Sequence, residues 1–191
     1  MKPTRSALRA DLRARRAALR PGERLAAADA VARHLGERPE LREPGYVGGY
    51  WAVNGELPLH AVQLRLAPGQ VWCLPVTTPD GGLRFAPWRA GDPLAPNRYG
   101  IPEPVADTTL SPEAMGLVLL PLLGFDRDGT RLGMGGGYYD RAFAFRRERA
   151  APPRLVGVAY ACQETEGLAA EAWDVPLDAI ATEAGFLAFG R

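Results

Sequence analysis

Residues 116–141 read GLVLLPLLGFDRDGTRLGMGGGYYDR, an apolar run followed by a glycine-rich loop and a cluster of aromatic and charged residues. The run at 116–122 is short and almost free of polar residues, as expected for a central strand that is buried on both faces of a sheet. Four of the seven residues from Gly133 to Tyr139 lack a β-carbon. A purely structural loop rarely gives up so much backbone order, so the stretch predicts a ligand site directly after a buried strand.

The elements on either side of this stretch alternate in a way that favours the α/β class. Apolar residues at helical spacing predict helices at 4–19, 25–36, 56–67, 138–150 and 166–172. Short apolar and β-branched runs predict strands at 45–53, 70–78, 83–88, 116–122, 154–161, 178–182 and 185–189. The segment 89–114 is rich in proline and glycine and is long for a plain connection, so it predicts a functional loop.

Composition limits the possible classes of protein. The 191 residues are 47% hydrophobic and 24% charged, which is typical of a globular chain with one domain, or one domain and a small lobe. A net charge of +1 argues against a general attraction to nucleic acid or membranes, and no segment is apolar for long enough to span a bilayer. Cys73 and Cys162 stand alone, so we expect neither a disulfide framework nor a zinc site and a cytoplasmic location.

Positive charge is concentrated near the N-terminus, where residues 1–24 contain eight basic side chains and two acidic ones. The predicted helix at 4–19 places its leucines on one stripe. An adjacent stripe, which we call the arginine stripe, consists of Arg5, Arg9, Arg13, Arg16 and Arg20. An arginine face of this kind is most often simply solvated.

The glycine loop has the composition of an anion site. Free backbone N–H groups in a glycine-rich turn, together with the positive end of the next helix, form a cradle for phosphate. No GK[ST] follows, and Tyr138 stands where a dinucleotide fingerprint requires glycine. The glycines alone fit a tight packing turn equally well. Arg131 upstream is a candidate partner of phosphate oxygens, and Asp140 downstream is a candidate Mg²⁺ ligand or a first-turn carboxylate that stabilises the helix.

The stretch 120–141, LPLLGFDRDGTRLGMGGGYYDR, resembles the signature of the 5-formyltetrahydrofolate cyclo-ligase (5,10-methenyltetrahydrofolate synthetase) family in its bacterial form. Three further pieces agree in order: the basic helix at 5–9, Glu56 in NGELPL, and a D-x-x-x-D pair at Asp174 and Asp178 before IATE. The resemblance implies a single three-layer α/β/α domain over residues 1–191, with a central, mainly parallel sheet and later strands at an edge. It also implies an enzyme that uses ATP and Mg²⁺ to convert 5-formyltetrahydrofolate into 5,10-methenyltetrahydrofolate.

Site residues follow from the same resemblance. It implies that Arg131 and Asp140 are catalytic, that Asp140 and Asp178 hold Mg²⁺, and that Trp51 and Glu56 contact the pterin of the reduced folate. The implied ATP site consists of Arg5, Ser6, Ala7, Leu8, Arg9, Arg131, Leu132, Gly133, Met134, Gly135, Gly136, Gly137, Tyr138 and Tyr139. Taken alone, Trp51 is typical of a core or groove aromatic and Glu56 of a charge at a helix N-terminus.

The sequence departs from the family pattern in the charged positions. Arg5 replaces a lysine, and Met134 and Gly136 stand where some members carry basic residues, so phosphate must be neutralised by the backbone, other arginines and the metal. Tyr138 and Tyr139 fit contact with nucleotide, contact with folate, or simple packing. Two other hypotheses are a relative that activates a different substrate with ATP, and a nucleic-acid-binding module, which the near-neutral charge disfavours. We expect a monomer.

Overall fold

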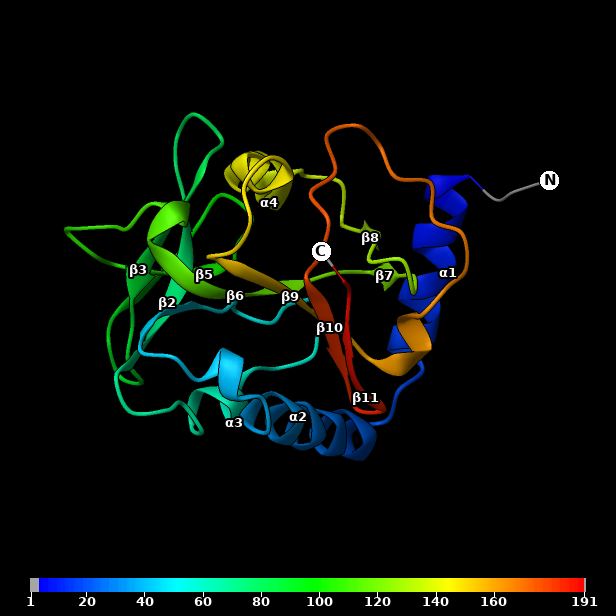
Figure 1. The fold of residues 1–191 in the computed structure, drawn as a ribbon, viewed down its shortest axis with the longest axis horizontal. Helices are drawn as coiled ribbons and strands as arrows, with labels where there is room; N and C mark the ends of the chain where they lie inside the picture. The colour runs from blue at the N-terminus through cyan, green and yellow to red at the C-terminus, as the bar shows by residue number, and fades with distance from the viewer. Residues whose placement is uncertain (1–3, 191) are drawn as a thin grey trace.

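The computed structural model describes residues 4–190 and is built around a seven-stranded sheet with the order β11-β10-β9-β6-β1-β2-β3 (Figure 1). Neighbouring strands from β10 to β2 run parallel, and β3 and β11 are antiparallel strands at the two edges. The strands are β1 (Gly45–Gly48), β2 (Gln70–Thr77), β3 (Leu83–Pro87), β6 (Met115–Pro121), β9 (Arg154–Val158), β10 (Ala179–Thr182) and β11 (Gly185–Ala188). The predicted α/β class and mainly parallel sheet are confirmed, with the last strands at an edge.

Helices and irregular segments cover both faces of this sheet. On one face, α2 (Pro21–Gly36) and α3 (His60–Gln63) bury alanine, valine and leucine side chains against β1, β6, β9 and β10. On the other face, α4 (Tyr138–Ala142), the 3₁₀ turn η3 (Ala144–Arg147) and the segment around Leu177 pack on β2, β3, β6 and β9. Figure 1 shows α2 and α3 on one side of the sheet and α4 on the other.

The N-terminal helix α1 (Arg5–Ala17) lies beside the small hairpin of β7 (Gly124–Phe125) and β8 (Arg131–Leu132), at the end toward which β6 runs (Figure 1). Thr4 caps the helix by accepting a hydrogen bond from the Ala7 N–H at 3.2 Å. Leu12 is fully buried against Gly124, where a β-carbon would lie 2.5 Å from its Cδ1 atom. Helix α1 therefore packs across the carboxyl end of the central strand, where ligands bind in α/β sheets.

Three predicted helices differ from the structure. Residues 50–59 are irregular, and only His60–Gln63 of the predicted helix 56–67 is helical, because Leu57 and Leu59 are both buried and face the core with the alternation of an extended chain. The predicted helix 138–150 changes from α to 3₁₀ geometry at Phe143. Residues 166–172 contain no helix.

The segment 89–114 has more structure than the predicted loop. It contains a hairpin of β4 (Leu94–Pro96) and β5 (Pro102–Pro104) and the 3₁₀ turn η2 (Pro112–Ala114). Two further 3₁₀ turns are η1 (Pro39–Leu41) and η4 (Ala161–Gln163). No helix within residues 4–190 is both long enough and apolar enough to cross a membrane.

The strand order defines where a ligand is expected to lie. Strands β1 and β6 are neighbours at the centre of the sheet. After β1 the chain continues to β2 on one side, and after β6 it continues to β9 on the other side, so the strand order reverses between β1 and β6. A crevice opens outside the carboxyl ends of parallel strands at such a switch point, and it is the usual ligand site of this architecture. Tyr50 follows β1, Pro121 ends β6, and the glycine loop comes after both β6 and β8.

Candidate active site

The glycine loop presents a row of free backbone donors. None of the N–H groups of residues 133–137 donates a hydrogen bond to any residue that the structure describes. Gly135 and Gly137 have φ angles of +107° and +65°, a backbone conformation that side chains with a β-carbon rarely adopt. Helix α4 has only five residues, so its dipole adds little. The loop is therefore suited to bind an anion, mainly through its backbone N–H groups.

Cavities of about 370 and 430 Å³ lie at the surface of this protein. The cavity of about 430 Å³ lies beside the glycine loop, and two arginines that line it give it positive charge. Arg141 donates to the carbonyl oxygens of Gly136 at 2.9 Å and Gly81 at 3.1 Å, and Arg147 donates to that of Trp173 at 3.0 Å. Neither arginine has a carboxylate partner among residues 4–190. Their charges are therefore uncompensated, which favours an anionic ligand. The lining residues are Gly135, Gly136, Gly137, Asp140, Arg141, Ala144, Arg147 and Trp173.

Arg131 does not face this cavity as a phosphate partner. Its side chain is only 6% exposed and forms an ion pair with Asp140. The same Asp140 oxygen, Oδ1, accepts a hydrogen bond from the Val175 N–H at 3.0 Å, and no described residue donates to Oδ2. Arg131 thus fixes the orientation of Asp140, a residue that lines the cavity and whose Oδ2 atom has no described donor.

The two segments predicted to form the ATP site do meet. Arg9 donates from Nε to the carbonyl oxygen of Gly133 at 3.0 Å, which places α1 against the glycine loop. Arg5 points elsewhere, because it donates to the Ala169 carbonyl at 2.6 Å and to the Asp174 carboxylate at 3.0 Å. Of the other predicted residues, Ser6, Ala7 and Met134 are exposed, Leu8 is half-buried and Leu132 is buried.

A second cavity, of about 140 Å³, lies at the switch point of the sheet. We call it the aromatic pocket. It brings together Trp51, Glu56, Tyr138 and Tyr139, which the sequence predicted as site residues, with Tyr50, Val53, Pro75, Thr77, Leu83, Asn97, Tyr99, Ile101, Pro102, Glu103 and Pro121. Trp51 stands edge-on to Trp88 with ring centroids 5.9 Å apart. An adjoining cavity of about 430 Å³ shares Tyr50 and Trp51 and adds further aromatic lining from Trp72 and Trp88.

Glu56 is, with Glu103, one of two half-buried acids that line the aromatic pocket. Its Oε2 atom accepts a hydrogen bond from the Val53 N–H at 3.0 Å. Burial raises the pKa of Glu56, while the Val53 N–H and the positive charge of Arg16 oppose that rise. A carboxylate in an apolar, aromatic cavity is suited to accept N–H groups of a flat heterocycle.

The hairpin of β4 and β5 reaches across to α4 at this pocket. Arg98 donates a hydrogen bond to the Tyr138 hydroxyl, which also lies 2.8 Å from the Tyr99 hydroxyl. These contacts lower the pKa of Tyr138, first through the Tyr99 hydroxyl and then through Arg98. Segment 89–114 therefore supplies one wall of the aromatic pocket.

Asp178 does not join Asp140. It directly precedes β10, and its carboxylate accepts two hydrogen bonds from Arg146, at 2.7 and 2.9 Å, and one from the Leu155 N–H at 2.7 Å. Within the described residues, no group of three or more His, Cys, Asp or Glu side chains is arranged to hold a metal ion. Asp178 fastens η3 to the amino ends of β9 and β10, which leaves its predicted role as a metal ligand without geometric support.

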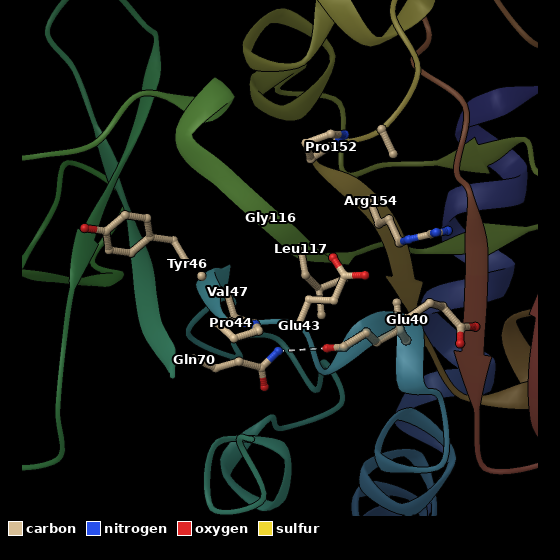
Figure 2. A pocket seen from close by; sticks show the side chains of 13 residues that line it. Glu40, Glu43, Pro44, Tyr46, Val47, Gln70, Gly116, Leu117, Pro152 and Arg154 are labelled. Atoms are coloured by element: carbon tan, nitrogen blue, oxygen red, sulfur yellow. Dashed lines mark hydrogen bonds between the residues drawn. The ribbon is translucent and has the colours of Figure 1, made fainter. Parts of the chain in front are cut away.

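A further cavity, of about 370 Å³, lies at the opposite, amino ends of β1, β2, β6 and β9 (Figure 2). It contains none of the predicted site residues. Its Gln70 donates to the Leu41 carbonyl at 2.8 Å, and its charged side chains, Glu40, Glu43 and Arg154, are exposed. No buried polar side chain of the described residues lines this cavity, so nothing indicates that it binds a ligand.

The fold agrees with the comparison with known proteins. A model of the 5-formyltetrahydrofolate cyclo-ligase family matches residues 1–183. The chain belongs to this family. It is 33% identical to 5-formyltetrahydrofolate cyclo-ligase of Haemophilus influenzae, over 91% of this chain and 94% of that protein. It is 34% identical to the protein of the same name in Escherichia coli K12, over 90% and 96%.

Solved structures of the family share the fold. The 5,10-methenyltetrahydrofolate synthetase of Aquifex aeolicus, an NMR structure, superposes with a TM-score of 0.83 at 30% identity and covers 98% of this chain and 94% of that one. The synthetase of Mycoplasma pneumoniae superposes at 0.72 with 22% identity, over 95% and 99%. The cyclo-ligase fold expected from the glycine-loop signature is thus confirmed.

The sequence did not predict several residues that line the two cavities. Arg141 is the last residue of the signature and Arg147 lies six residues after it, a spacing that gives no helical stripe to single them out. Trp173 and Tyr99 lie in irregular segments that only tertiary contacts bring to the cavities. Arg16 was assigned to the solvated arginine stripe, yet it is only 2% exposed.

Proposed function

We propose that this protein is a 5-formyltetrahydrofolate cyclo-ligase, which uses ATP to convert 5-formyltetrahydrofolate into 5,10-methenyltetrahydrofolate, ADP and phosphate. The observation that carries the proposal is that residues 135–141 wall two cavities at once. Gly135, Gly136, Gly137, Asp140 and Arg141 line the positively charged cavity, and Tyr138 and Tyr139 between them line the aromatic pocket. A phosphate and a flat heterocycle would therefore lie on opposite sides of one short turn.

The chemistry needs that proximity. The N5-formyl group is amide-like, so its carbon is a poor electrophile because nitrogen donates electrons into the carbonyl. In the proposed reaction the formyl oxygen attacks the γ-phosphorus of ATP, and the bond to the ADP oxygen breaks. N10 then attacks the formyl carbon, loses its proton, and the phosphate leaves with the former formyl oxygen.

The residues supply positioning and charge rather than a nucleophile. The pterin would lie in the aromatic pocket against Trp51, with its N–H groups donating to Glu56, and the aminobenzoyl part would extend into the adjoining cavity. The phosphates would lie on the free N–H groups of residues 133–137, with Arg141 and Arg147 neutralising the charge that develops on the transferred group. Arg9 would hold the loop from outside, through Gly133.

Mg²⁺ fits this site through one protein ligand. Enzymes that act on ATP commonly hold Mg²⁺ with one or two carboxylates and the substrate phosphates, rather than with a cage of side chains. Asp140 has the free oxygen Oδ2 at the cavity with the glycines, and Arg131 keeps that carboxylate oriented. When bound there, Mg²⁺ would withdraw charge from the phosphate oxygens.

The proposed function is tested by mixing the purified protein with 5-formyltetrahydrofolate, ATP and Mg²⁺ and recording the absorbance of the methenyl product at the edge of the visible range. We expect product only when all three are present, with one ADP released per methenyl group. ATP binding without product from folded protein would contradict the folate assignment and favour a relative that activates another substrate. We also propose a cytoplasmic location, on the sparse cysteines, and the expected monomeric state stays a prediction.

A further inference from the structure

Arg16 is a buried arginine without a role in the proposed reaction. It lies on α1 and is only 2% exposed. Its Nη2 atom donates to the carbonyl oxygen of Asn54 at 2.8 Å, and its Nη1 atom lies 3.5 Å from that of Leu122, just after β6. Among residues 4–190, no carboxylate forms an ion pair with it. Burying an unpaired charge is costly, so a role beyond packing is expected.

The carbonyl that Arg16 holds belongs to the turn that presents Glu56. Asn54 has a φ angle of 52° and is the one residue other than glycine with a positive φ in the described chain, and Gly55 follows at 78°. The turn is closed by the Glu56 N–H, which donates to the Val53 carbonyl at 3.0 Å, and by the Val53 N–H, which donates to the Glu56 carboxylate. Such a turn is held in its uncommon conformation by its surroundings, and Arg16 is the side chain that binds its centre.

The charge of Arg16 also acts on Glu56 directly. The positive charge of Arg16 opposes the rise that burial causes in the pKa of Glu56, and Glu56 in turn opposes the lowering that burial causes in the pKa of Arg16. The other titratable groups that act on Glu56 or share its pocket are Tyr50 after β1, Tyr139 and Tyr138 on α4, and Tyr99 and Glu103 of the β4–β5 hairpin. Arg24 of α2 lies beside Gly55. Tyrosines are neutral at ordinary pH, and Arg16 is the positive charge that opposes the rise in the pKa of Glu56 and so favours its ionised form.

Resting on the proposed function, we propose that Arg16 is a positioning residue for the folate substrate. It holds the turn 53–56 in place and favours the ionised form of Glu56, so that the carboxylate can accept the pterin N–H groups. Arg16 itself does not line the aromatic pocket and touches no reacting atom. The proposal assigns one buried side chain of the arginine stripe to substrate recognition rather than to ATP.

Two variants separate the geometric role of Arg16 from its electrostatic role. Arg16→Met removes both the hydrogen bond and the charge, and Arg16→Lys keeps the charge. Arg13→Met is the matched control, because Arg13 is exposed on the same helix. Steady-state rates of methenyl formation are measured against pH for each variant, with KM determined separately for 5-formyltetrahydrofolate and ATP, and urea unfolding checks that each variant is folded.

For Arg16→Met we expect the KM for folate to rise about tenfold or more, the loss expected when a hydrogen bond from a charged group is removed, with the KM for ATP unchanged. Protonation of Glu56 below its pKa weakens folate binding at acidic pH. Because removing a positive charge raises that pKa further, the acid limb of kcat/KM for folate should move to higher pH. Arg16→Lys should keep the wild-type acid limb with an intermediate KM.

A merely structural role would not move the acid limb. The proposal is overturned if folded Arg16→Met keeps the wild-type KM for folate and the wild-type acid limb, or if it raises both KM values equally. If Arg16→Met does not fold, Arg16→Lys decides: a raised KM for folate alone supports the proposal, and wild-type kinetics overturn it. These outcomes leave wild-type turnover intact, whereas a wild-type protein that forms no methenyl product overturns the proposed function and this proposal with it.

Discussion

The Arg131–Asp140 pair makes a sharp prediction, because a buried ion pair and an exposed carboxylate differ in their effect on stability. The two side chains are 6% and 17% exposed. The Nε atom of Arg131 is buried and has no hydrogen-bond partner, so Asp140 is its main compensation. Breaking such a pair from one side costs about 3–5 kcal/mol, since it leaves an uncompensated buried charge. An exposed first-turn carboxylate would contribute only about 1 kcal/mol.

Asp140→Ala is therefore expected to lower the free energy of unfolding by about 3–5 kcal/mol, a large share of the roughly 5–15 kcal/mol that stabilises a typical domain. The measurement is urea unfolding followed by far-ultraviolet circular dichroism, analysed with a linear dependence on urea. Asp107→Ala is the control, because Asp107 is exposed and its side chain has no hydrogen bond to a described residue. It should leave the unfolding midpoint unchanged.

A double variant tests the cause. Arg131→Met combined with Asp140→Leu removes both charges, so it should recover much of the stability that Asp140→Ala loses. If Asp140→Ala lost less than about 1 kcal/mol, the buried-pair interpretation would be wrong and Asp140 would be an ordinary surface acid. Catalysis is then better tested with Asp140→Asn, which keeps one oxygen to accept from Arg131 and Val175 while removing the negative charge. It should remain folded and lose turnover.

Three further predictions address other parts of the site. Arg9→Ala should raise the KM for ATP by about tenfold with the KM for folate unchanged, because Arg9 binds the Gly133 carbonyl. The opposite pattern in steady-state kinetics would show that Arg9 does not contribute to the proposed nucleotide site. Asp178→Asn should lower the free energy of unfolding by about 1.5–3 kcal/mol, because it weakens the hydrogen bonds to Arg146, and should leave the Mg²⁺ concentration for half-maximal rate unchanged. A shift in that Mg²⁺ concentration would indicate that Asp178 is a metal ligand after all. Gly49→Ala would place a β-carbon 2.0 Å from Cζ2 of the buried Trp72 and should cost about 1–3 kcal/mol in urea unfolding, whereas Gly22→Ala, with nothing within 4 Å, should not destabilise the protein.

The parts of the fold that the sequence predicted well are those with a local cause. The run 116–122 is apolar throughout because β6 is covered on both faces, and the helices near residues 5–17 and 21–36 carry clear apolar stripes. The change of helix type at Phe143 was not predictable in this way. Phe143 is fully buried and Phe145 packs beside it, with ring centroids 6.1 Å apart. Two residues that lie two positions apart point to opposite sides of an α-helix, so the chain tightens to bring both rings to the core.

The segment near 166–172 shows a different limit. Its backbone is held by side chains that are distant in sequence, since Arg5 binds the Ala169 carbonyl and Asp126 accepts from the Leu168 N–H at 3.2 Å. These partners form hydrogen bonds with backbone N–H and carbonyl groups that would pair within the segment if it were a helix. The local sequence pattern does not reveal such distant partners. The same contacts bring Trp173 to the glycine-loop cavity, so the missed structure and the missed site residue share one cause.

The residues of the arginine stripe share one sequence pattern but contact different parts of the protein. Arg9 and Arg16 are two turns apart on α1, about 10.5 Å along its axis, yet Arg9 binds the glycine loop and Arg16 binds the turn of Glu56. Arg5 holds the segment of Trp173, and Arg13 is exposed. Because one helix contacts both the glycine loop and the turn of Glu56, a displacement of α1 at Gly133 would also act on Glu56. The N-terminal helix is thus placed to fix the distance between the two substrates, which the proposed phosphoryl transfer requires.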